Sequence, residues 1–382
     1  MSPPHSGCGP GRPWAATVAE EEVTGRAQLT ALAQLEGMTI ARLARVLRHH
    51  ETDEAFHRVA SGRVGAEVAD ERIRRAWAVE ARSVALSSVD QKLAEFGVEA
   101  TSWHHPDHPV VLTADIDPAP VLFRIGRLPP VDCPRVAIVG TRRCSGAGLE
   151  TAYELGSGLA AAGVVVVSGL AIGVDGAAHE GALAARGAPP LAVVGSGPDI
   201  VYPRRHRALW QRVAEQGCLC TEAPLGAEPA AWRFPARNRL IAAFADLVVV
   251  VESRSAGGSL LTVEQAIRRG VDVMAVPGSV RNPAAEGANQ LLVDGCAPVR
   301  STSDVLLALG LSAVERSVRR AGDTPLPKGR AATVLAAVDD GPTTIDEIVG
   351  RCGLEVRAVL AEVEILLGLG HLVADGARVR RA

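Results

Sequence analysis

Aromatic residues, methionine and surplus positive charge are all scarce in this chain. Aromatic side chains make up 3% of its 382 residues, and methionine occurs three times. The formal net charge of −3 excludes a protein that coats nucleic acid through bulk positive charge, so any phosphate binding has to be local. Hydrophobic residues nevertheless make up 47% of the chain, which predicts large aliphatic cores and more than one globular domain.

The chain also lacks the features of an exported, membrane-bound or disulfide-stabilised protein. No run approaches the roughly 18 apolar residues of a membrane span, and the Gly/Pro-rich stretch Met1–Pro13 has no apolar core of a signal peptide. The seven cysteines form no paired framework, and Cys218-Leu219-Cys220 lacks the CxxC spacing of a zinc site. We therefore expect a soluble, cytoplasmic protein with reduced, buried cysteines, no membrane partner and no cofactor.

Three histidines gather in a proline-rich stretch, at His104, His105 and His108. Neither an HxxxH nor an HExxH spacing accompanies them, and such stretches more often form surface turns than metal sites. We expect a surface turn and no bound metal.

The middle of the chain alternates short aliphatic runs with longer stretches of helical pattern. Continuous aliphatic runs are typical of parallel strands, because helices cover both faces of such a sheet. The candidate strands are Val136–Val139, Val164–Ser168, Leu191–Gly195, Cys218–Thr221, Leu247–Glu252 and Val271–Val276. The alternation predicts an α/β fold, an extended Rossmann-like parallel sheet with helices on both faces. Pro118–Gly126 is expected to be an edge strand leading into it.

Glycine-bearing turns follow the first three of these strands. They contain Gly140-Thr141-Arg142, Ser168-Gly169 and Gly195-Ser196-Gly197. A glycine turn between a strand and a helix presents backbone N–H groups at the positive end of a helix dipole, which favours phosphate. Ligands of parallel sheets bind beyond the carboxyl ends of the strands, so we expect one polyanion or nucleotide surface here.

A second informative stretch, residues 232–241, joins an aromatic ring to several cations directly before a helix. Its candidate contact residues are Phe234, Arg237, Asn238 and Arg239. The guanidinium group of arginine forms paired hydrogen bonds to phosphates and stacks on bases, and a phenylalanine ring can stack on a base face. The alternative, that these arginines pair with surface carboxylates, stays open. Gly257-Gly258-Ser259 supplies a further glycine turn at a helix start.

The segment that precedes the sheet has a helical pattern. Over residues 26–100, apolar stripes at helical spacing are interrupted at Glu36–Thr39. Two short helices around a glycine turn fit either a helix-hairpin-helix that contacts DNA or a small protein-interaction module. We favour the interaction module, because the turn has one glycine where such hairpins usually carry two.

The C-terminal segment predicts three helices closed by a hairpin, which is the pattern of a winged helix. Its third helix carries Glu355, Glu362 and Glu364 against a single Arg357, a poor surface for DNA. We therefore favour a protein-interaction or regulatory role. The expected parts of the chain are a flexible leader (1–25), the helical module (26–100), the Rossmann-like domain (101–312), a basic linker (313–330) and the winged helix (331–382).

A set of motifs in the central segment resembles the DprA (Smf) family of DNA-processing proteins. They are VAIVGTR, SGLAIGVDGAAH, GSGPDIVYP, FPARNRLIA, VVVVE, GGSLLT and VPGS, in the order and approximate spacing of that family over residues 110 to 310. The resemblance implies a non-enzymatic, homodimeric protein that binds single-stranded DNA without sequence preference. It also implies that the strand is protected and passed to the RecA recombinase during DNA uptake and natural transformation.

The resemblance also implies roles for particular residues. The expected DNA or phosphate contacts are Gly140, Thr141, Arg142, Ser168, Gly169, Phe234, Arg237, Asn238, Arg239, Gly257, Gly258 and Ser259. Asp175 and His179 lie one helical turn apart, and we expect them to brace the glycine loop rather than to act on a substrate. No catalytic residue and no metal ligand is implied.

The sequence also offers two enzymatic alternatives. GGSLLTVE resembles the PGGxGTxxE motif of the lysine-decarboxylase-like phosphoribohydrolases of nucleoside monophosphates, in which the glutamate, here Glu264, helps to cleave an N-glycosidic bond. The proline and the third glycine of that motif are missing here. A nicotinamide-dependent enzyme is excluded, because the first turn is not GxGxxG and no acidic residue follows the second strand in the ribose-binding position.

Overall fold

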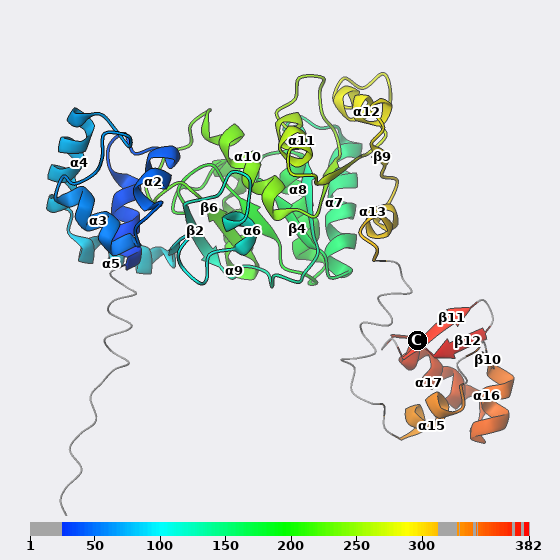
Figure 1. Ribbon diagram of the computed structural model, residues 1–382. Helices are drawn as coiled ribbons and strands as arrows, with labels where there is room; N and C mark the ends of the chain where they lie inside the picture. The colour runs from blue at the N-terminus through cyan, green and yellow to red at the C-terminus, as the bar shows by residue number, and fades with distance from the viewer. Residues whose placement is uncertain are drawn as a thin grey trace, which may run out of the picture. The chain divides into compact units, whose positions relative to one another are not determined.

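The computed structural model describes residues 25–311, 327, 329–338, 341, 343–368, 371–375 and 378–381 (Figure 1). The described residues up to Thr302 belong to one compact unit, and those from Ser303 onward belong to a second. Almost all of the expected leader and most of the expected linker lie outside the described residues. Each helix in the described ranges is too short or too polar to cross a bilayer.

The first unit begins with a cluster of helices, as the apolar stripes predict. The chain is helical from residue 25 to residue 34, and then come α2 (Ile40–Leu47), α3 (Thr52–Ala60), α4 (Glu71–Ser83) and α5 (Leu86–Phe96). Leu32 and Trp77 of this cluster are fully buried in one core with Val121 and Phe123 of the adjacent sheet. The helical module is therefore packed onto the edge of the sheet rather than separated from it.

Among the described residues, a nine-stranded sheet forms the centre of the unit, in the order β1-β2-β6-β5-β4-β3-β7-β8-β9 (Figure 1). β2 is antiparallel to both of its neighbours, and every neighbouring pair from β6 to β9 is parallel. The strands are β1 (Glu99–Ser102), β2 (Val121–Gly126), β3 (Arg135–Val139), β4 (Val165–Ser168), β5 (Leu191–Val193), β6 (Cys218–Thr221), β7 (Leu247–Val250), β8 (Asp272–Ala275) and β9 (Ala297–Pro298).

All six strands predicted from aliphatic runs are confirmed, with ends that differ by one or two residues. The prediction of an edge strand at Pro118–Gly126 is wrong in its position. β2 forms there, but β1 pairs with it on one side and β6 on the other. The short polar run of β1, Glu99-Ala100-Thr101-Ser102, gives no aliphatic signal by which it could be recognised.

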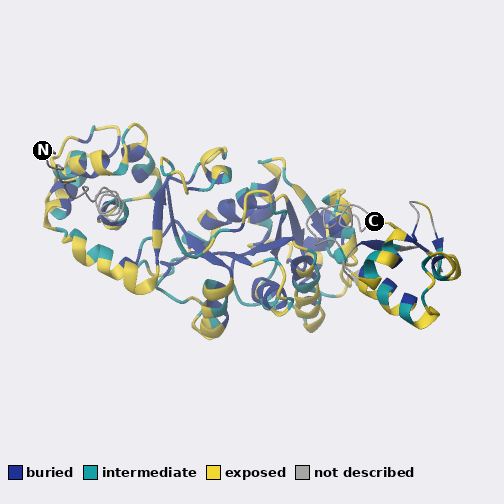
Figure 2. Ribbon diagram, turned by 90° about the horizontal axis from the view of Figure 1, so that it is seen from below, coloured by how far each residue is buried: buried dark blue, intermediate teal, exposed yellow. Residues whose placement is uncertain are grey.

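Helices cover both faces of the sheet, which confirms the predicted α/β fold. They are α6 (Val110–Thr113), α7 (Gly146–Ala161), α8 (Val174–Ala184), α9 (Arg207–Gln216), α10 (Arg233–Phe244), α11 (Leu260–Ile267) and α12 (Glu286–Val293). Side chains alternate along each strand. Leu191 and Val193 of β5 share a core with α10 and α11, whereas Ala192 packs with Trp210 of α9. β3 to β7 are accordingly buried along their whole length, and the outward helix faces are exposed (Figure 2).

Glycines let α7 and α8 approach each other closely. A Cβ atom on Gly156 of α7 would lie 2.2 Å from the backbone oxygen of Ala178, and one on Gly181 of α8 would lie 2.0 Å from that of Tyr153. Because neither position has room for a side chain, this contact requires glycine on both helices. The contact fixes α7 and α8 side by side beneath the sheet.

The second unit confirms the predicted winged helix. It contains α13 (Thr302–Ala308), α15 (Arg330–Ala336), α16 (Ile345–Cys352), α17 (Val356–Gly368) and a sheet of order β10-β12-β11, formed by β10 (Thr343–Thr344), β11 (Leu372–Asp375) and β12 (Arg378–Arg381). Thr344 and Glu347 form a capping box that begins α16. Val334, Ile348 and Leu366 are buried in a core of their own.

Candidate nucleic-acid interface

An open pocket lies at the carboxyl ends of β3 and β7. These strands are neighbours in the sheet although β4, β5 and β6 lie between them in the chain, so the strand order reverses at this point. The pocket has a volume of about 860 Å³. Its walls are the turn after β3, the first turns of α10 and the glycine turn before α11.

Most of the contact residues proposed from the sequence line this pocket. They are Gly140, Thr141, Arg142, Phe234, Arg237, Asn238, Gly257, Gly258 and Ser259. Gly169 lies beside it, in a smaller hollow of about 30 Å³ that Arg142 and Phe234 also line. The amide of Asn238 donates to the backbone oxygen of Gly258 at 3.4 Å, which ties α10 to the glycine turn.

A cation and two aromatic rings stack at the wall of the pocket. The guanidinium carbon of Arg142 lies 4.9 Å from the centre of the Phe234 ring, and the Tyr202 ring centre lies 5.3 Å from that of Phe234. Arg142 is exposed, and no ion pair joins it to a carboxylate of the described residues. The arrangement offers a cation for a phosphate and a ring face for a base.

The pocket lining also contains two charged residues and one aromatic residue beyond those expected from the sequence, namely Arg143, Arg254 and Tyr202. Arg143 and Arg254 lie in the turns that follow two of the predicted strands, so the rule that ligands bind at carboxyl ends points to both. Tyr202 reaches the pocket from the segment after β5; it belongs to the motif GSGPDIVYP, but nothing in the sequence assigned it a contact.

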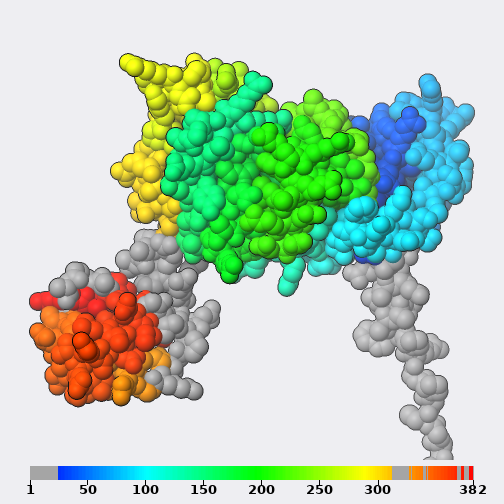
Figure 3. Space-filling view, turned by 180° about the vertical axis from the view of Figure 1, so that it is seen from behind, coloured from blue at the N-terminus to red at the C-terminus, as the bar shows by residue number. Residues whose placement is uncertain are grey.

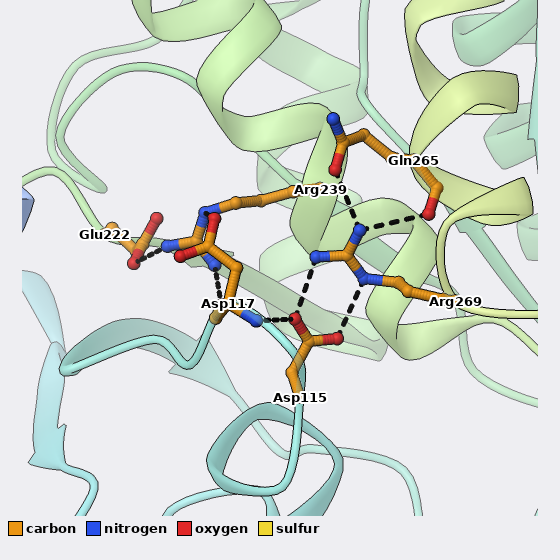
Figure 4. Close-up of polar contacts among 6 residues, drawn as sticks. All are labelled: Asp115, Asp117, Glu222, Arg239, Gln265 and Arg269. Carbon is orange, nitrogen blue, oxygen red and sulfur yellow. Dashed lines mark hydrogen bonds and ion pairs between the residues drawn. The ribbon is translucent and has the colours of Figure 1, made fainter.

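Two of the proposed contacts lie elsewhere. The hydroxyl of Ser168 is fully buried and donates to the backbone oxygen of Ile138 at 2.6 Å, so it joins β4 to β3 instead of lining the pocket. Arg239 does not line the pocket, and its side chain reaches toward Glu222 and Asp117 (Figure 4). Successive helical residues are rotated by about 100°, so α10 turns Arg237 and Asn238 to the pocket and Arg239 to its other side.

Arg239 instead belongs to a buried polar network (Figure 4). Its guanidinium pairs with Glu222 at 2.5 Å and donates to the backbone oxygen of Asp117 at 2.7 Å. Beside it, Arg269 donates twice to Asp115, at 2.8 Å each. Burial raises the pKa of Glu222 to about 7, against the opposing effect of Arg239. The network fastens the loop before β2 to α10 and α11.

The phosphate cradle expected at the start of α7 is filled by the protein itself. The buried carboxylate of Glu252 accepts hydrogen bonds from the backbone N–H of Ser145 at 2.8 Å and from its hydroxyl at 2.6 Å. Asn282 donates to the same carboxylate at 2.9 Å. The first glycine turn therefore lines the pocket with Thr141 and Arg142, but the helix start behind it already holds an anion.

Asp175 occupies the glycine turn after β4 with a carboxylate, as Glu252 occupies the start of α7. Its buried carboxylate accepts from the N–H of Gly169 at 3.1 Å and lies 3.9 Å from the guanidinium of Arg237. Burial raises the pKa of Asp175, and Arg237 opposes that rise. Asp175 thus holds the glycine turn after β4 by a hydrogen bond to its backbone. His179 does not: its ring nitrogen Nε2 lies 3.4 Å from the backbone oxygen of Leu191, on β5.

The start of α11 faces the pocket, and no carboxylate lies in its first turn. Gly258 is exposed, with no atom near the position of a Cβ. The hydroxyl of Ser259 is occupied by Ser253 at 2.8 Å. Backbone N–H groups at this end are therefore available to a phosphate in the pocket.

The histidine-rich stretch forms a turn, as expected, but one of its histidines is not at the surface. His108 is buried, and its Nδ1 lies 3.1 Å from the hydroxyl of Thr101. Burial lowers the pKa of His108 to about 4. Across the described residues, no three His, Cys, Asp or Glu side chains are arranged to hold a metal ion.

Comparison with known proteins identifies the family. A family model described as DNA recombination-mediator protein A matches residues 99–310, which is more than half of the chain. The chain belongs to the DprA family. A second model, described as the DprA winged helix domain, matches residues 320–366. The family is one of DNA-processing proteins.

Relatives within the family are similar over most of the chain. Protein Smf of Escherichia coli is 34% identical over 284 residues, which cover 72% of this chain and 76% of that protein. A DprA of Mycobacterium tuberculosis is 40% identical over 257 residues. The chain spans 64% of the length of that relative, and 64% of this chain is covered.

Two solved structures of the family resemble this one. DprA of Streptococcus pneumoniae superposes with a TM-score of 0.63 and 29% identity, and covers 74% of this chain and 97% of its own. DprA of Helicobacter pylori superposes with a TM-score of 0.50 and 26% identity, and covers 56% and 97%. That structure is described for its single-stranded DNA binding mode.

Proposed function

We propose that this protein binds single-stranded DNA without sequence preference in the pocket between β3 and β7. The stack of Arg142, Phe234 and Tyr202 carries the proposal, because it pairs a free guanidinium with ring faces on an open surface. Ring faces accept any base, but only when the base is unstacked, as in a single strand. The single-stranded DNA binding described for the Helicobacter pylori relative supports this assignment.

The pocket residues divide into three roles under this proposal. Arg142, Arg143 and Arg254 meet phosphates through exposed guanidinium groups. Phe234 meets a base. Gly258 and Ser259, at the start of α11, present backbone N–H groups, whereas the N–H of Gly257 donates to the backbone oxygen of Arg254. Ser168, Asp175 and Arg239 support the pocket from within.

We also propose the wider role that the family resemblance implies. In it, the protein is a cytoplasmic homodimer that protects incoming strands and loads RecA on them during DNA uptake. Sedimentation of the purified chain tests the dimer, and the rate of RecA filament formation on a coated strand tests the loading. A monomer at micromolar concentration, or a rate that the protein does not change, would contradict these parts.

For the winged helix we propose a protein partner rather than DNA. α17 exposes Val356 and Leu360, each about half accessible, on the same face as the acidic Glu364, because the three residues are spaced by four along the helix. An apolar and acidic face suits a protein surface and repels a phosphate backbone.

Binding of a fluorescent oligothymidine strand and of its matched duplex tests the proposal. We expect the wild type to prefer the single strand, and Arg142→Ala to weaken that binding about tenfold or more, since a charged hydrogen bond is worth about 1.5–3 kcal/mol. Arg268→Ala is the matched control, because this exposed arginine follows α11 at the opposite edge of the sheet. Equal losses in both variants, or no preference for the single strand, would refute the proposed site.

The enzymatic alternative makes a different prediction. A phosphoribohydrolase needs its glutamate at the substrate, but Glu264 is exposed on α11 and does not line the pocket. We expect no free base to be released from AMP by the purified protein. Release that Glu264→Ala abolishes would establish the enzyme instead.

A further inference from the structure

A second hollow adjoins the pocket and shares Arg142 with it. Its volume is about 420 Å³, and it lies between the start of α8 and the short helix η1 (Arg204–His206) that leads into α9. Arg142 and Ile172 also line the small hollow beside the main pocket, so the three hollows adjoin one another. The segments around α7 and α9 lie on one face of the molecule, in blue-green and green in Figure 3.

The rim of this second hollow is basic. Arg205 lines it, and Arg204 and Arg207 on either side in the chain are likewise exposed. Within the described residues, none of these three arginines forms an ion pair with a carboxylate. The acidic side chain in the lining, Glu180, is already paired with Arg212 of α9. The excess of unpaired positive charge favours an anion here.

The floor of the hollow is apolar. Leu149 of α7, Ile172 and Leu209 of α9 line it, and Leu149 is 43% exposed although it is a leucine. The ring of His206 is fixed at the side, with Nδ1 3.1 Å from the backbone oxygen of Leu170. An apolar floor under a basic rim matches a nucleotide unit, whose base is apolar on its faces and whose phosphate is anionic.

We propose that this hollow is a second nucleotide subsite, in which Arg205 binds a phosphate of the strand after the strand has passed over Arg142. The inference rests on the proposed function, because the occupant is the same single strand. The proposal also gives the course of the bound strand, which runs from the pocket at the carboxyl ends of β3 and β7 toward α8 and α9. It also predicts that the affinity grows with strand length until both hollows are filled.

A length series with matched variants tests the subsite. Oligothymidines of about 4 and about 16 nucleotides span the footprints common among single-strand binders. Arg205→Ser should weaken binding of the long strand about tenfold and lower its salt slope by about 0.7, the contribution of one phosphate contact, while the short strand is unaffected. Arg127→Ser is the control, since this exposed arginine lies next to Gly217 at the amino edge of the parallel strands.

The outcomes separate the subsite from the proposed function. If the wild type binds neither strand, the proposed function and the subsite both fail. If it binds both but Arg205→Ser changes neither affinity, the subsite alone fails, and the basic rim is then free for an acidic protein partner. Equal losses for Arg205→Ser and Arg127→Ser also overturn the subsite, because they report only net charge.

Cysteine alkylation gives a second readout in the unaltered protein. Cys144 lines the second hollow, whereas Cys296 immediately precedes β9, at the amino edge of the sheet, and both are free thiols of intermediate exposure. The long strand should slow iodoacetamide modification of Cys144 several-fold, and the short strand should not, with Cys296 unchanged in both. Equal protection by the two strands, or none by either, would contradict the subsite.

Discussion

At the scale of the single residue, the glycines around the pocket differ in what they allow. A Cβ on Gly169 would lie 1.8 Å from the guanidinium of Arg237, whereas a Cβ on Gly258 meets no atom within 4 Å. The first glycine makes room for a buried cation that donates to the backbone oxygen of Val193. The second leaves a helix start open to solvent.

Gly169 and Gly258 are therefore expected to differ in how strongly an alanine substitution lowers stability. Gly169→Ala should lower the free energy of unfolding by about 1–3 kcal/mol, the usual penalty for inserting a methyl group into a packed site. It should also weaken strand binding, because Arg237 has to move. Gly258→Ala should leave stability nearly unchanged. Urea unfolding of the two variants measures the difference, and equal stabilities would contradict the packing described for Arg237.

Buried histidines predict a pH dependence of stability. Burial lowers the pKa of His108, and that of His179, from 6.5 to about 4 in the folded protein. Between these values the unfolded chain binds the protons and the folded protein does not, so stability is full above pH 6.5 and falls as the pH drops toward 4. Each histidine contributes a slope of up to about 1.4 kcal/mol per pH unit.

The variant His108→Asn tests this assignment. Its amide oxygen can still accept from Thr101, but it has no proton to bind in this range. Denaturant unfolding across the window should show a shallower fall of stability with decreasing pH than in the wild type. An unchanged slope would mean that His108 is not held neutral by burial.

At the scale of the element, α10 joins the pocket to the buried network. It presents Phe234 and Arg237 on one side and Arg239 on the other. The helix is therefore held by Glu222 and Asp117 from behind while its front forms the pocket wall (Figure 4). In the structure, the side of α10 that lines the pocket is distinct from the side that anchors the helix. The sequence motif alone does not show which residues belong to which side.

Arg239→Met separates these effects experimentally. Leaving the buried Glu222 without its partner should lower the free energy of unfolding by about 3–5 kcal/mol. Replacing both partners, as Arg239→Met with Glu222→Leu, should recover most of that loss. Strand affinity of the folded variants should stay within about twofold of the wild type, as for distant sites. A loss of affinity as large as that of Arg142→Ala would show that Arg239 contacts DNA.

The sequence predicts the elements of the sheet well and their long-range partners poorly. Aliphatic runs locate β3 to β8, because strands with helices packed on both faces are composed mainly of apolar residues. β1 escapes notice because it is short and partly polar. The motif around α10 indicates a site, but which side of the helix each arginine occupies depends on where the helix begins and what it packs against.

The same limit applies to the helix starts. A glycine turn predicts available backbone N–H groups, but Glu252 lies more than a hundred residues from Ser145 in the chain and reaches it only in the folded sheet. A local pattern cannot show that a distant carboxylate has taken the place of a phosphate. Tyr202 is the opposite case, a distant residue that completes the site.

At the scale of the whole molecule, the net charge of −3 repels phosphate, so any attraction of DNA comes from local positive charge. Phosphate binding therefore depends on a few exposed arginines, Arg142, Arg143 and Arg254 in the pocket and Arg205 beside it. The net charge gives no general attraction to duplex DNA. We therefore expect the pocket, and not the net charge of the protein, to determine the preference for single-stranded over duplex DNA.

This balance predicts a shallow salt dependence. Three to four phosphate contacts on a single strand correspond to a slope of about −2 to −3 in a plot of log K against log salt concentration. Fluorescence anisotropy over a salt series gives the slope directly. A slope several times steeper would mean that a basic surface far larger than the pocket and its rim binds the strand.

Photocrosslinking of a strand that carries 5-iododeoxyuridine shows whether the pocket at the carboxyl ends of β3 and β7 binds the strand. Excited iodouracil attaches to aromatic side chains that stack on it, and the attached peptide identifies the contact. We expect the label on Phe234 or Tyr202, and its loss in the double variant Phe234→Leu with Tyr202→Leu, which should still bind the strand, though more weakly. A label confined to the N-terminal helices or to the winged helix would contradict the account and move the DNA site out of the sheet.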